Sequence, residues 1–477
     1  MITCRNFFAG HWQDSAGAPI ERHNPATGKL VAAAPRSTAS DVDAAVAAAK
    51  AAFRGWRRTL PAERAGLLHE LARHCARRVD DLASAITREQ GKPLDEARGE
   101  VRKFITALHY YAEEATRVFG KTVPNDARGY LSIVEKEPVG VIGGIVPWNY
   151  PIELIGWKLA ASVAAGCTIV IKPSEYTPGC AHVLSECVAM AFPPGVVNFV
   201  YGDGSTGQVL AEHPDLAKIA FTGSMRTGQA IFRAVTGITA LSLELGGSCP
   251  MIVTARADLE AAVAGATRRS FRNAGQICIA INRIYVQDAV YGEFVSRFAE
   301  AADALRVADG TDEPSADVGA MTMRETYQRT LDHLADARAR GARVVAGGGP
   351  LEELRPGLFL RPTVVADVPD QARAMREETF GPLAGVAPFS SLDDAIARAN
   401  AVPGGLAAYA YTRDMGESFT LARELDFGNV AVNNVDAGIM NAPYGGRRES
   451  GFGSEHGHEG LESYLQFKHV RIRHGAD

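Results

Sequence analysis

The periodicity of apolar residues along this chain changes near residue 140. Before that point apolar residues recur at intervals of three and four, a spacing that predicts amphipathic helices. A turn-rich segment, 8–28, comes first, and Ser40 is then placed to cap the first helix. The expected helices cover 41–53, 62–78, 79–90 and 94–119. The first quarter of the chain is therefore predicted to be mainly helical.

Beyond residue 140, short β-branched runs alternate with amphipathic stretches. The expected strands are 141–146, 168–171, 196–200, 218–221 and 240–245, and the expected helices between them are 151–165, 178–191, 205–213 and 226–235. This alternation predicts an α/β fold with a parallel sheet. A second alternating series from 250 to about 428, with helices over 290–305 and 324–341, predicts a second α/β domain. The tail 463–473 alternates like a strand, and we expect it to pair with another subunit or domain.

Composition excludes several classes of protein. The 477 residues carry 50 Lys and Arg against 55 Asp and Glu, a net charge of −5 that argues against a nucleic-acid partner or an anionic membrane surface. The most apolar run, 159–171, is too short to span a bilayer. Seven scattered cysteines without metal-ligand spacing predict neither a disulfide framework nor a metal site, and they favour a reducing, cytoplasmic location.

Three polar residues interrupt apolar surroundings at predicted strand ends or Gly-marked loops: Asn149, Glu244 and Cys278. A thiol can act as a nucleophile, a carboxylate can activate water and an amide can donate to an oxyanion. Each also has a simpler interpretation. Cys278 alone is more often a small buried hydrophobe, Glu244 a helix cap or ion-pair partner and Asn149 a turn former.

Longer motifs surround these residues and give the chain a resemblance to a known family. The motifs lie at 145–149 (IVPWN), 172–175 (KPSE), 221–224 (FTGS), 243–247 (LELGG), 275–278 (GQIC), 378–382 (ETFGP) and 443–446 (PYGG). Together they resemble the aldehyde dehydrogenase superfamily over nearly the whole chain, and most closely its succinate-semialdehyde dehydrogenase-like branch. The resemblance implies two parallel-sheet α/β domains, a Rossmann-like cofactor domain and a catalytic domain, with a small β element for oligomerisation.

The resemblance also implies a division of labour in the site. Cys278 is the expected nucleophile, forming a thiohemiacetal and then a thioester that Glu244-activated water hydrolyses. Asn149 and the Cys278 backbone N–H would hold the oxyanion, a contribution of about 3 kcal/mol per donor. Lys158 and Glu455 match positions linked to proton relay, with exposed surface charges as the alternative. Ser454 stands where an Arg commonly precedes that Glu, which weakens the assignment of Glu455.

A nicotinamide cofactor follows from the same resemblance. The Gly-x-Gly-x-x-Gly pattern at 202–207 lacks an acidic residue about 20 positions onward, so the expected ribose ligands are Lys172 and Glu175 instead. A carboxylate there repels a 2′-phosphate, which favours NAD over NADP. The residues expected around the cofactor are Val146, Pro147, Trp148, Lys172, Ser174, Glu175, Gly204, Phe221, Thr222, Gly223, Ser224, Leu245, Glu378 and Phe380. Ser248 replaces a Lys that usually follows Leu-Gly-Gly.

The substrate is less closely defined. Arg272 matches an arginine that pairs with the carboxylate of a semialdehyde, but the second arginine of that branch is Trp157 here, and Ala280 replaces a common cysteine. Tyr150, Trp157 and Tyr444 present aromatic faces that suit an aromatic or apolar aldehyde. A semialdehyde or aromatic aldehyde is therefore expected first, and an amino- or betaine aldehyde second. A CoA-acylating enzyme or an inactive structural homologue is the remaining alternative.

The expected domain boundaries follow the same comparison. Residues 1–119 and 139–246 form the NAD-binding domain, and 247–445 form the catalytic domain. Residues 120–138 and 446–477 supply oligomerisation segments and the tail. The expected partners are a small aldehyde and further copies of the chain, as a homodimer or homotetramer.

Overall fold

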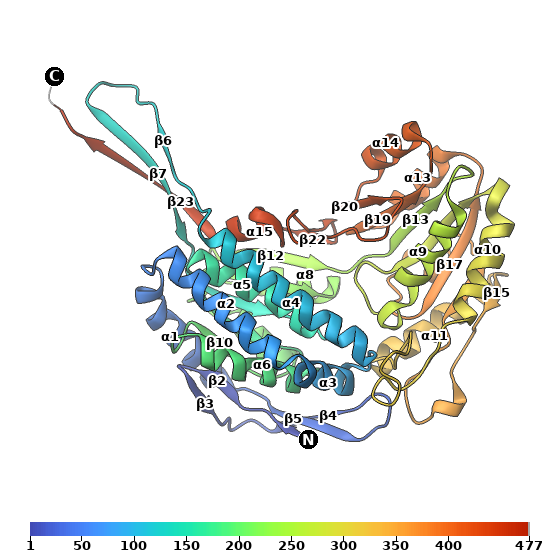
Figure 1. Ribbon diagram of the computed structural model, residues 1–477, viewed down its shortest axis with the longest axis horizontal. Helices are drawn as coiled ribbons and strands as arrows, with labels where there is room; N and C mark the ends of the chain where they lie inside the picture. Colours follow the sequence, from blue (N-terminus) through green and yellow to red (C-terminus); the bar gives the residue numbers. More distant parts are fainter. Residues whose placement is uncertain (476–477) are drawn as a thin grey trace.

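Two large, mostly parallel sheets form the body of the molecule (Figure 1). The computed structural model describes residues 1–475. The first sheet has eight strands in the order β22-β12-β11-β8-β9-β10-β2-β3, and the second has seven in the order β15-β16-β17-β14-β13-β19-β20. The predicted α/β class with two parallel-sheet units is therefore confirmed.

The first sheet contains the strands expected from the alternating pattern. Its members are β2 (Asn6–Phe8), β3 (His11–Gln13), β8 (Val141–Ile145), β9 (Thr168–Lys172), β10 (Val197–Phe199), β11 (Lys218–Gly223), β12 (Ala240–Leu245) and β22 (Gly451–Phe452). The helices that follow its parallel strands are α5 (Pro151–Ala165), α6 (Pro178–Ala191), α7 (Gly204–Ala211) and α8 (Met225–Ala234). The central strands β8 and β9 are buried along their whole length, as continuous apolar runs in a parallel sheet predict.

The N-terminal region departs from the expected pattern. Short strands occupy part of the segment 8–28 that the sequence indicated as turn-rich, and β1 (Ile2–Thr3), β4 (Pro19–His23) and β5 (Leu30–Pro35) form a small sheet of their own. The helices are α1 (Ala39–Trp56), α2 (Pro61–Arg77), α3 (Val79–Gln90) and α4 (Leu94–Ala115). Thr38, not Ser40, caps α1, because the Thr38 hydroxyl and the Asp41 carboxylate form a reciprocal capping box.

The second sheet carries the later half of the chain. Its strands are β13 (Cys249–Val253), β14 (Ile281–Gln287), β15 (Arg343–Ala346), β16 (Thr363–Ala366), β17 (Leu383–Phe389), β19 (Ala407–Tyr411) and β20 (Asn429–Val432). The associated helices are α9 (Leu259–Phe271), η1 (Arg272–Gly275), α10 (Asp288–Asp303), α11 (Arg324–Ala339), η2 (Glu352–Leu354), α12 (Arg373–Arg376), α13 (Leu392–Asn400) and α14 (Met415–Glu424). The remaining short elements are β18 (Gly404–Gly405), β21 (Arg447–Arg448) and α15 (Gly457–Glu462).

A three-stranded arm projects from one end of the molecule (Figure 1). It consists of β6 (Lys121–Val123), β7 (Tyr130–Pro138) and the C-terminal strand β23 (Leu465–Arg473). The strand predicted for the tail is therefore present as β23, and within the chain it pairs antiparallel with β7 along its full length. Phe467 on this arm is 75% exposed. Among the described residues, no helix is both long and apolar enough to cross a membrane.

Candidate functional site

A sharply turned loop between α9 and β14 carries Cys278. Asn273 and Ala274 have φ angles of 52° and 53°, and Gly275 follows with φ of 70°. A Cβ atom on Gly275 would lie 2.2 Å from the Gly381 carbonyl oxygen, so glycine is required there. The loop ends next to Tyr444, whose hydroxyl lies 3.5 Å from the Cys278 sulfur.

The Cys278 thiol is protonated in this environment. Burial raises its pKa to about 12, and the hydrogen bond with Tyr444 opposes that shift only in part. The thiolate is the reactive form of cysteine, so a proton acceptor must lie within reach.

Glu244, near the end of β12, has the properties of such an acceptor. Its side chain is buried, and neither carboxylate oxygen has a hydrogen-bond partner among residues 1–475. Burial and the neighbouring Glu455 hold its pKa well above the usual value, with Lys158 acting in the opposite direction. A raised pKa brings a carboxylate closer to the range in which a general base works at neutral pH.

Lys158 and Glu455 form an ion pair next to this carboxylate. Their side chains are 1% and 6% exposed, so neither is a surface charge. The Lys158 ammonium also donates to the Thr222 hydroxyl at 2.6 Å. Thr222 and Glu244 are register partners on β11 and β12, which places the group near the carboxyl ends of these two neighbouring strands.

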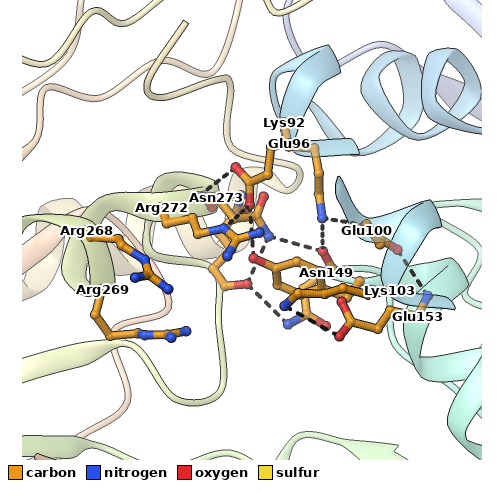
Figure 2. A network of polar contacts seen from close by, with 12 residues as sticks. Lys92, Glu96, Glu100, Lys103, Asn149, Glu153, Arg268, Arg269, Arg272 and Asn273 are labelled. Atoms are coloured by element: carbon orange, nitrogen blue, oxygen red, sulfur yellow. Dashed lines mark hydrogen bonds and ion pairs between the residues drawn. The ribbon is translucent and has the colours of Figure 1, made fainter. Parts of the chain in front are cut away.

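Asn149 is held by a buried network that sequence reasoning missed (Figure 2). The Asn149 side-chain amide donates to the Gln276 backbone carbonyl at 3.1 Å. The backbone carbonyl of Asn149 accepts from the Lys92 ammonium at 2.7 Å and from the Asn273 side-chain amide at 3.1 Å. Lys92 also pairs with Glu100 at 2.7 Å, and both side chains are 0% exposed. The only signal in the sequence is that Lys92 lies between a glycine and a proline, immediately after a helix.

The expected cofactor residues gather along the carboxyl ends of the first sheet's parallel strands, where α/β folds bind ligands. Strand β8 is followed by Val146, Pro147 and Trp148, and strand β9 is followed by Ser174 and Glu175. Helix α7 begins at Gly204. Strand β11 ends with Phe221, Thr222 and Gly223, and strand β12 ends with Leu245. Lys172 pairs with Glu175 at 3.2 Å. Ser224 caps α8, a helix N-terminus of the kind that binds phosphate.

Two further residues of this group come from the second half of the chain. Glu378 is partly buried, accepts the Gly247 N–H at 3.3 Å and has a pKa raised by desolvation to about 7. A Cβ atom on Gly246 would lie 2.3 Å from the Glu378 carboxylate, which shows how closely that carboxylate approaches the backbone. Phe380 has φ of 56° and packs edge-on against Trp148 with ring centroids 5.4 Å apart. These donors and acceptors fit a nicotinamide dinucleotide: a helix N-terminus for phosphates and carboxylates for ribose hydroxyls.

Arg272 is not a free cation. Its guanidinium pairs with Glu96 at 3.0 Å, and the same carboxylate accepts the Tyr150 hydroxyl at 3.0 Å and the Asn273 N–H at 3.2 Å (Figure 2). Glu96 comes from α4, far from Arg272 in sequence, and sequence reasoning did not identify it. Within residues 1–475, no group of three His, Cys, Asp or Glu side chains is arranged to hold a metal ion.

Comparison with known proteins places these features in context. The sequence model described as the aldehyde dehydrogenase family matches residues 12–470. The chain is 40% identical to the succinate-semialdehyde dehydrogenase [NADP(+)] of Escherichia coli (strain K12), covering 97% of this chain and 96% of that protein. It is also 40% identical to the 3-sulfolactaldehyde dehydrogenase of Pseudomonas putida, covering 98% and 97% of the two chains.

Solved structures give the same result for the fold. The crystal structure of an NADP-dependent enzyme from E. coli superposes with a TM-score of 0.96 at 39% identity, covering 99% of this chain and 98% of that one. A lactaldehyde dehydrogenase from Escherichia coli superposes with a TM-score of 0.96 at 34% identity, covering 99% of each chain.

Proposed function

This chain belongs to the aldehyde dehydrogenase family, and we propose that it oxidises a semialdehyde or an aromatic aldehyde to the carboxylic acid with NAD. Aldehyde oxidation with a nicotinamide cofactor follows from membership of this family. The observation that carries the proposal is the convergence of three groups. Cys278 is half-buried, with the high-pKa carboxylate of Glu244 nearby and the amide of Asn149 hydrogen-bonded to its loop.

The first step is attack of the Cys278 sulfur on the aldehyde carbon. Glu244 accepts the thiol proton, directly or through one water molecule, because its raised pKa makes it a stronger base than an exposed glutamate. The oxygen of the resulting thiohemiacetal carries negative charge. One hydrogen of the Asn149 amide is used on Gln276, and the other remains for this oxyanion together with the Cys278 backbone N–H.

The second half returns the enzyme to its starting state. A nicotinamide dinucleotide held by Lys172, Glu175, Ser224 and Glu378 would supply the hydride acceptor that allows the thiohemiacetal carbon to become a thioester on Cys278. Once Glu244 has released the thiol proton, it removes a proton from water and the water oxygen attacks the thioester carbon. The carbon–sulfur bond breaks, the leaving sulfur takes up the proton held by Glu244, and the carboxylic acid is released. Lys158 and Glu455 adjoin Glu244 and carry the thiol proton away from it before the hydrolysis begins.

The preference for NAD is argued from Glu175. Its carboxylate is 28% exposed beside Lys172, where it accepts hydrogen bonds from a free 2′-hydroxyl and repels a 2′-phosphate. Two of the similar proteins carry NADP(+) in their names, which points the other way. Glu175→Ser is therefore expected to shift the ratio of kcat/KM values toward NADP, and equal use of both cofactors by the unaltered enzyme would overturn the argument.

The substrate class is argued from Arg272 and from the relatives. Succinate-semialdehyde, glutarate-semialdehyde and 3-sulfolactaldehyde dehydrogenases all name substrates with an acidic group beyond the aldehyde. In this chain Glu96 neutralises Arg272 and Trp157 adds an aromatic surface, so an aromatic aldehyde is kept beside a semialdehyde. We also propose that the projecting arm joins further copies of the chain.

One assay tests the proposal. The purified enzyme is mixed with NAD or NADP and a panel of succinic semialdehyde, glutaric semialdehyde, benzaldehyde and betaine aldehyde, and the absorbance of the reduced cofactor is followed. Each reaction is repeated with coenzyme A, which would accelerate an acylating enzyme. Absence of reduced cofactor with every aldehyde would refute the proposed function.

A further inference from the structure

Three aromatic side chains form one wall of the site beside Cys278. Trp157 packs on a cluster that includes Ile277 and has its ring 5.7 Å from Tyr444 and 4.2 Å from His456, measured between centroids. The Tyr444 and His456 rings are 5.4 Å apart. Because the Tyr444 hydroxyl lies 3.5 Å from the Cys278 sulfur, this wall adjoins the position of the aldehyde.

The backbone holds His456 in this wall at the expense of local strain. The N–H and C=O groups of Tyr444 and Glu455 exchange two hydrogen bonds of 2.7 Å, which fixes the following residue next to the tyrosine. His456 has φ of 60° and ψ of 175°, a region that is essentially restricted to glycine. An imidazole is thus present at a position where the backbone favours no side chain, and such outliers cluster at functional sites.

The protonation of His456 can be assigned from its contacts. Its Nδ1 lies 3.2 Å from the Ile439 carbonyl oxygen, and because a carbonyl only accepts, Nδ1 carries the proton. Burial lowers the pKa of His456 to about 4, so the ring is neutral at physiological pH and Nε2 is an acceptor.

Two buried polar atoms in this wall lack a hydrogen-bond partner within the described part of the chain: the His456 Nε2 acceptor and the Trp157 Nε1–H donor. Leaving buried polar atoms unpaired costs free energy. A site with one unpaired donor and one unpaired acceptor therefore suits a ligand group that can both accept and donate a hydrogen bond. A hydroxyl group is such a partner, since it can accept from Trp157 and donate to His456.

We propose that Trp157 and His456 recognise a hydroxyl group on the substrate, so that the enzyme prefers aldehydes with a hydroxyl beyond the aldehyde carbon over their deoxy analogues. This inference rests on the proposed function, because it concerns the same site. It identifies His456 as a specificity-determining residue. A site built to hydrogen-bond a substrate hydroxyl discriminates strongly against the analogue that lacks it.

The test compares each parent aldehyde with its hydroxylated analogues: benzaldehyde with the 3-hydroxy and 4-hydroxy compounds, and succinic semialdehyde with its 2-hydroxy and 3-hydroxy forms. The readout is the ratio of kcat/KM values, hydroxylated over parent, in the unaltered enzyme and in His456→Gly. Glycine suits the local backbone and removes the imidazole. Comparing the same pair of substrates between enzymes cancels their intrinsic reactivities.

We expect the ratio for the best pair to fall by roughly tenfold or more in His456→Gly, mainly through KM, as loss of one hydrogen bond implies. Trp157→Phe removes the donor and is expected to lower the same ratio, which gives a second test if the glycine variant does not fold. Ala9→Gly, which also relieves a positive φ (53°) but lies in the distant β2–β3 turn, is the matched control and should leave the ratio unchanged.

An unchanged ratio in both His456→Gly and Trp157→Phe would overturn the inference, and so would a ratio lowered equally by Ala9→Gly. If the unaltered enzyme oxidises parent and hydroxylated aldehydes with equal kcat/KM values, only this inference is refuted. Failure to oxidise any aldehyde refutes the proposed function as well, so the two outcomes are distinguishable.

Discussion

Replacing Lys92 by methionine tests whether the buried network behind Asn149 positions the oxyanion donor. The Lys92 ammonium pairs with Glu100 at 2.7 Å, donates to the Asn149 carbonyl at 2.7 Å and lies 3.6 Å from the centre of the Tyr150 ring. Glu100 in turn accepts the N–H of Ile152 at 2.9 Å in the first turn of α5. Methionine keeps the length of the side chain but leaves a fully buried carboxylate without its cation.

Breaking a buried pair in this way costs about 3–5 kcal/mol, against about 0.5 kcal/mol for an ordinary surface change. Lys50→Met is the matched control, because Lys50 pairs with Asp215 at 2.6 Å on the surface, where the side chains are 54% and 44% exposed. Urea unfolding, followed by tryptophan fluorescence, measures the free energy of unfolding of both variants. In the double variant Lys92→Met/Glu100→Gln the uncompensated charge is gone, so we expect it to be more stable than Lys92→Met alone.

The same variant has a kinetic readout. Displacing Asn149 is expected to lower kcat, with the roughly 10²–10³-fold loss of an entire oxyanion donor as the upper limit. The reasoning would be refuted if Lys92→Met were no more destabilising than Lys50→Met, or if the double variant were as unstable as the single one.

Three further predictions concern the chemistry itself. Cys278→Ser should abolish formation of reduced cofactor while dinucleotide binding, measured by calorimetry, persists; residual turnover near the unaltered rate would exclude Cys278 as the nucleophile. The pKa of Glu244 is raised and only its deprotonated form is basic, so kcat/KM should increase as the pH rises through that pKa. Glu244→Gln should remove this pH dependence. A flat pH profile for the unaltered enzyme would contradict the assignment. Gly246→Ala should weaken dinucleotide binding, because the added Cβ would displace the Glu378 carboxylate. The control Gly99→Ala, with nothing within 4 Å of the added atom, should leave that binding unchanged. Equal dinucleotide affinities of the two variants would show that Glu378 does not bind the cofactor.

The alternating regions of the fold were predictable because a long periodic run defines its own boundaries. Helices α3, α5 and α6 and strand β12 begin and end at the predicted residues. The N-terminal strands β2 to β5 were missed, because turn residues separate them and they lack the continuous β-branched runs that mark the central strands of the first sheet. The tail strand was detected, but its partner β7 lies more than 300 residues earlier in the chain, and alternation does not identify a partner.

The candidate site shows the same limit. Motifs indicated Cys278, Glu244 and Asn149, because each lies in a recognisable local pattern. The partners that determine their environment come from elsewhere in the chain: Lys92 behind Asn149, and Glu96 on Arg272. An ion pair between distant segments leaves no periodic or spacing signal in either segment, so these contacts emerged only from the three-dimensional structure.

The short strand β22 has a consequence for how the enzyme comes into being on the ribosome. Gly451 and Phe452 pair with Glu244 and Leu243, so the strand that presents Glu244, the proposed general base, is completed by residues made roughly two hundred positions later. At a synthesis rate of about 5–20 residues per second, that interval lasts on the order of ten seconds or more. A nascent chain or a fragment that ends before residue 451 therefore contains Cys278 without the strand that completes the candidate site, and we expect no catalysis until β22 has been made and has paired with β12.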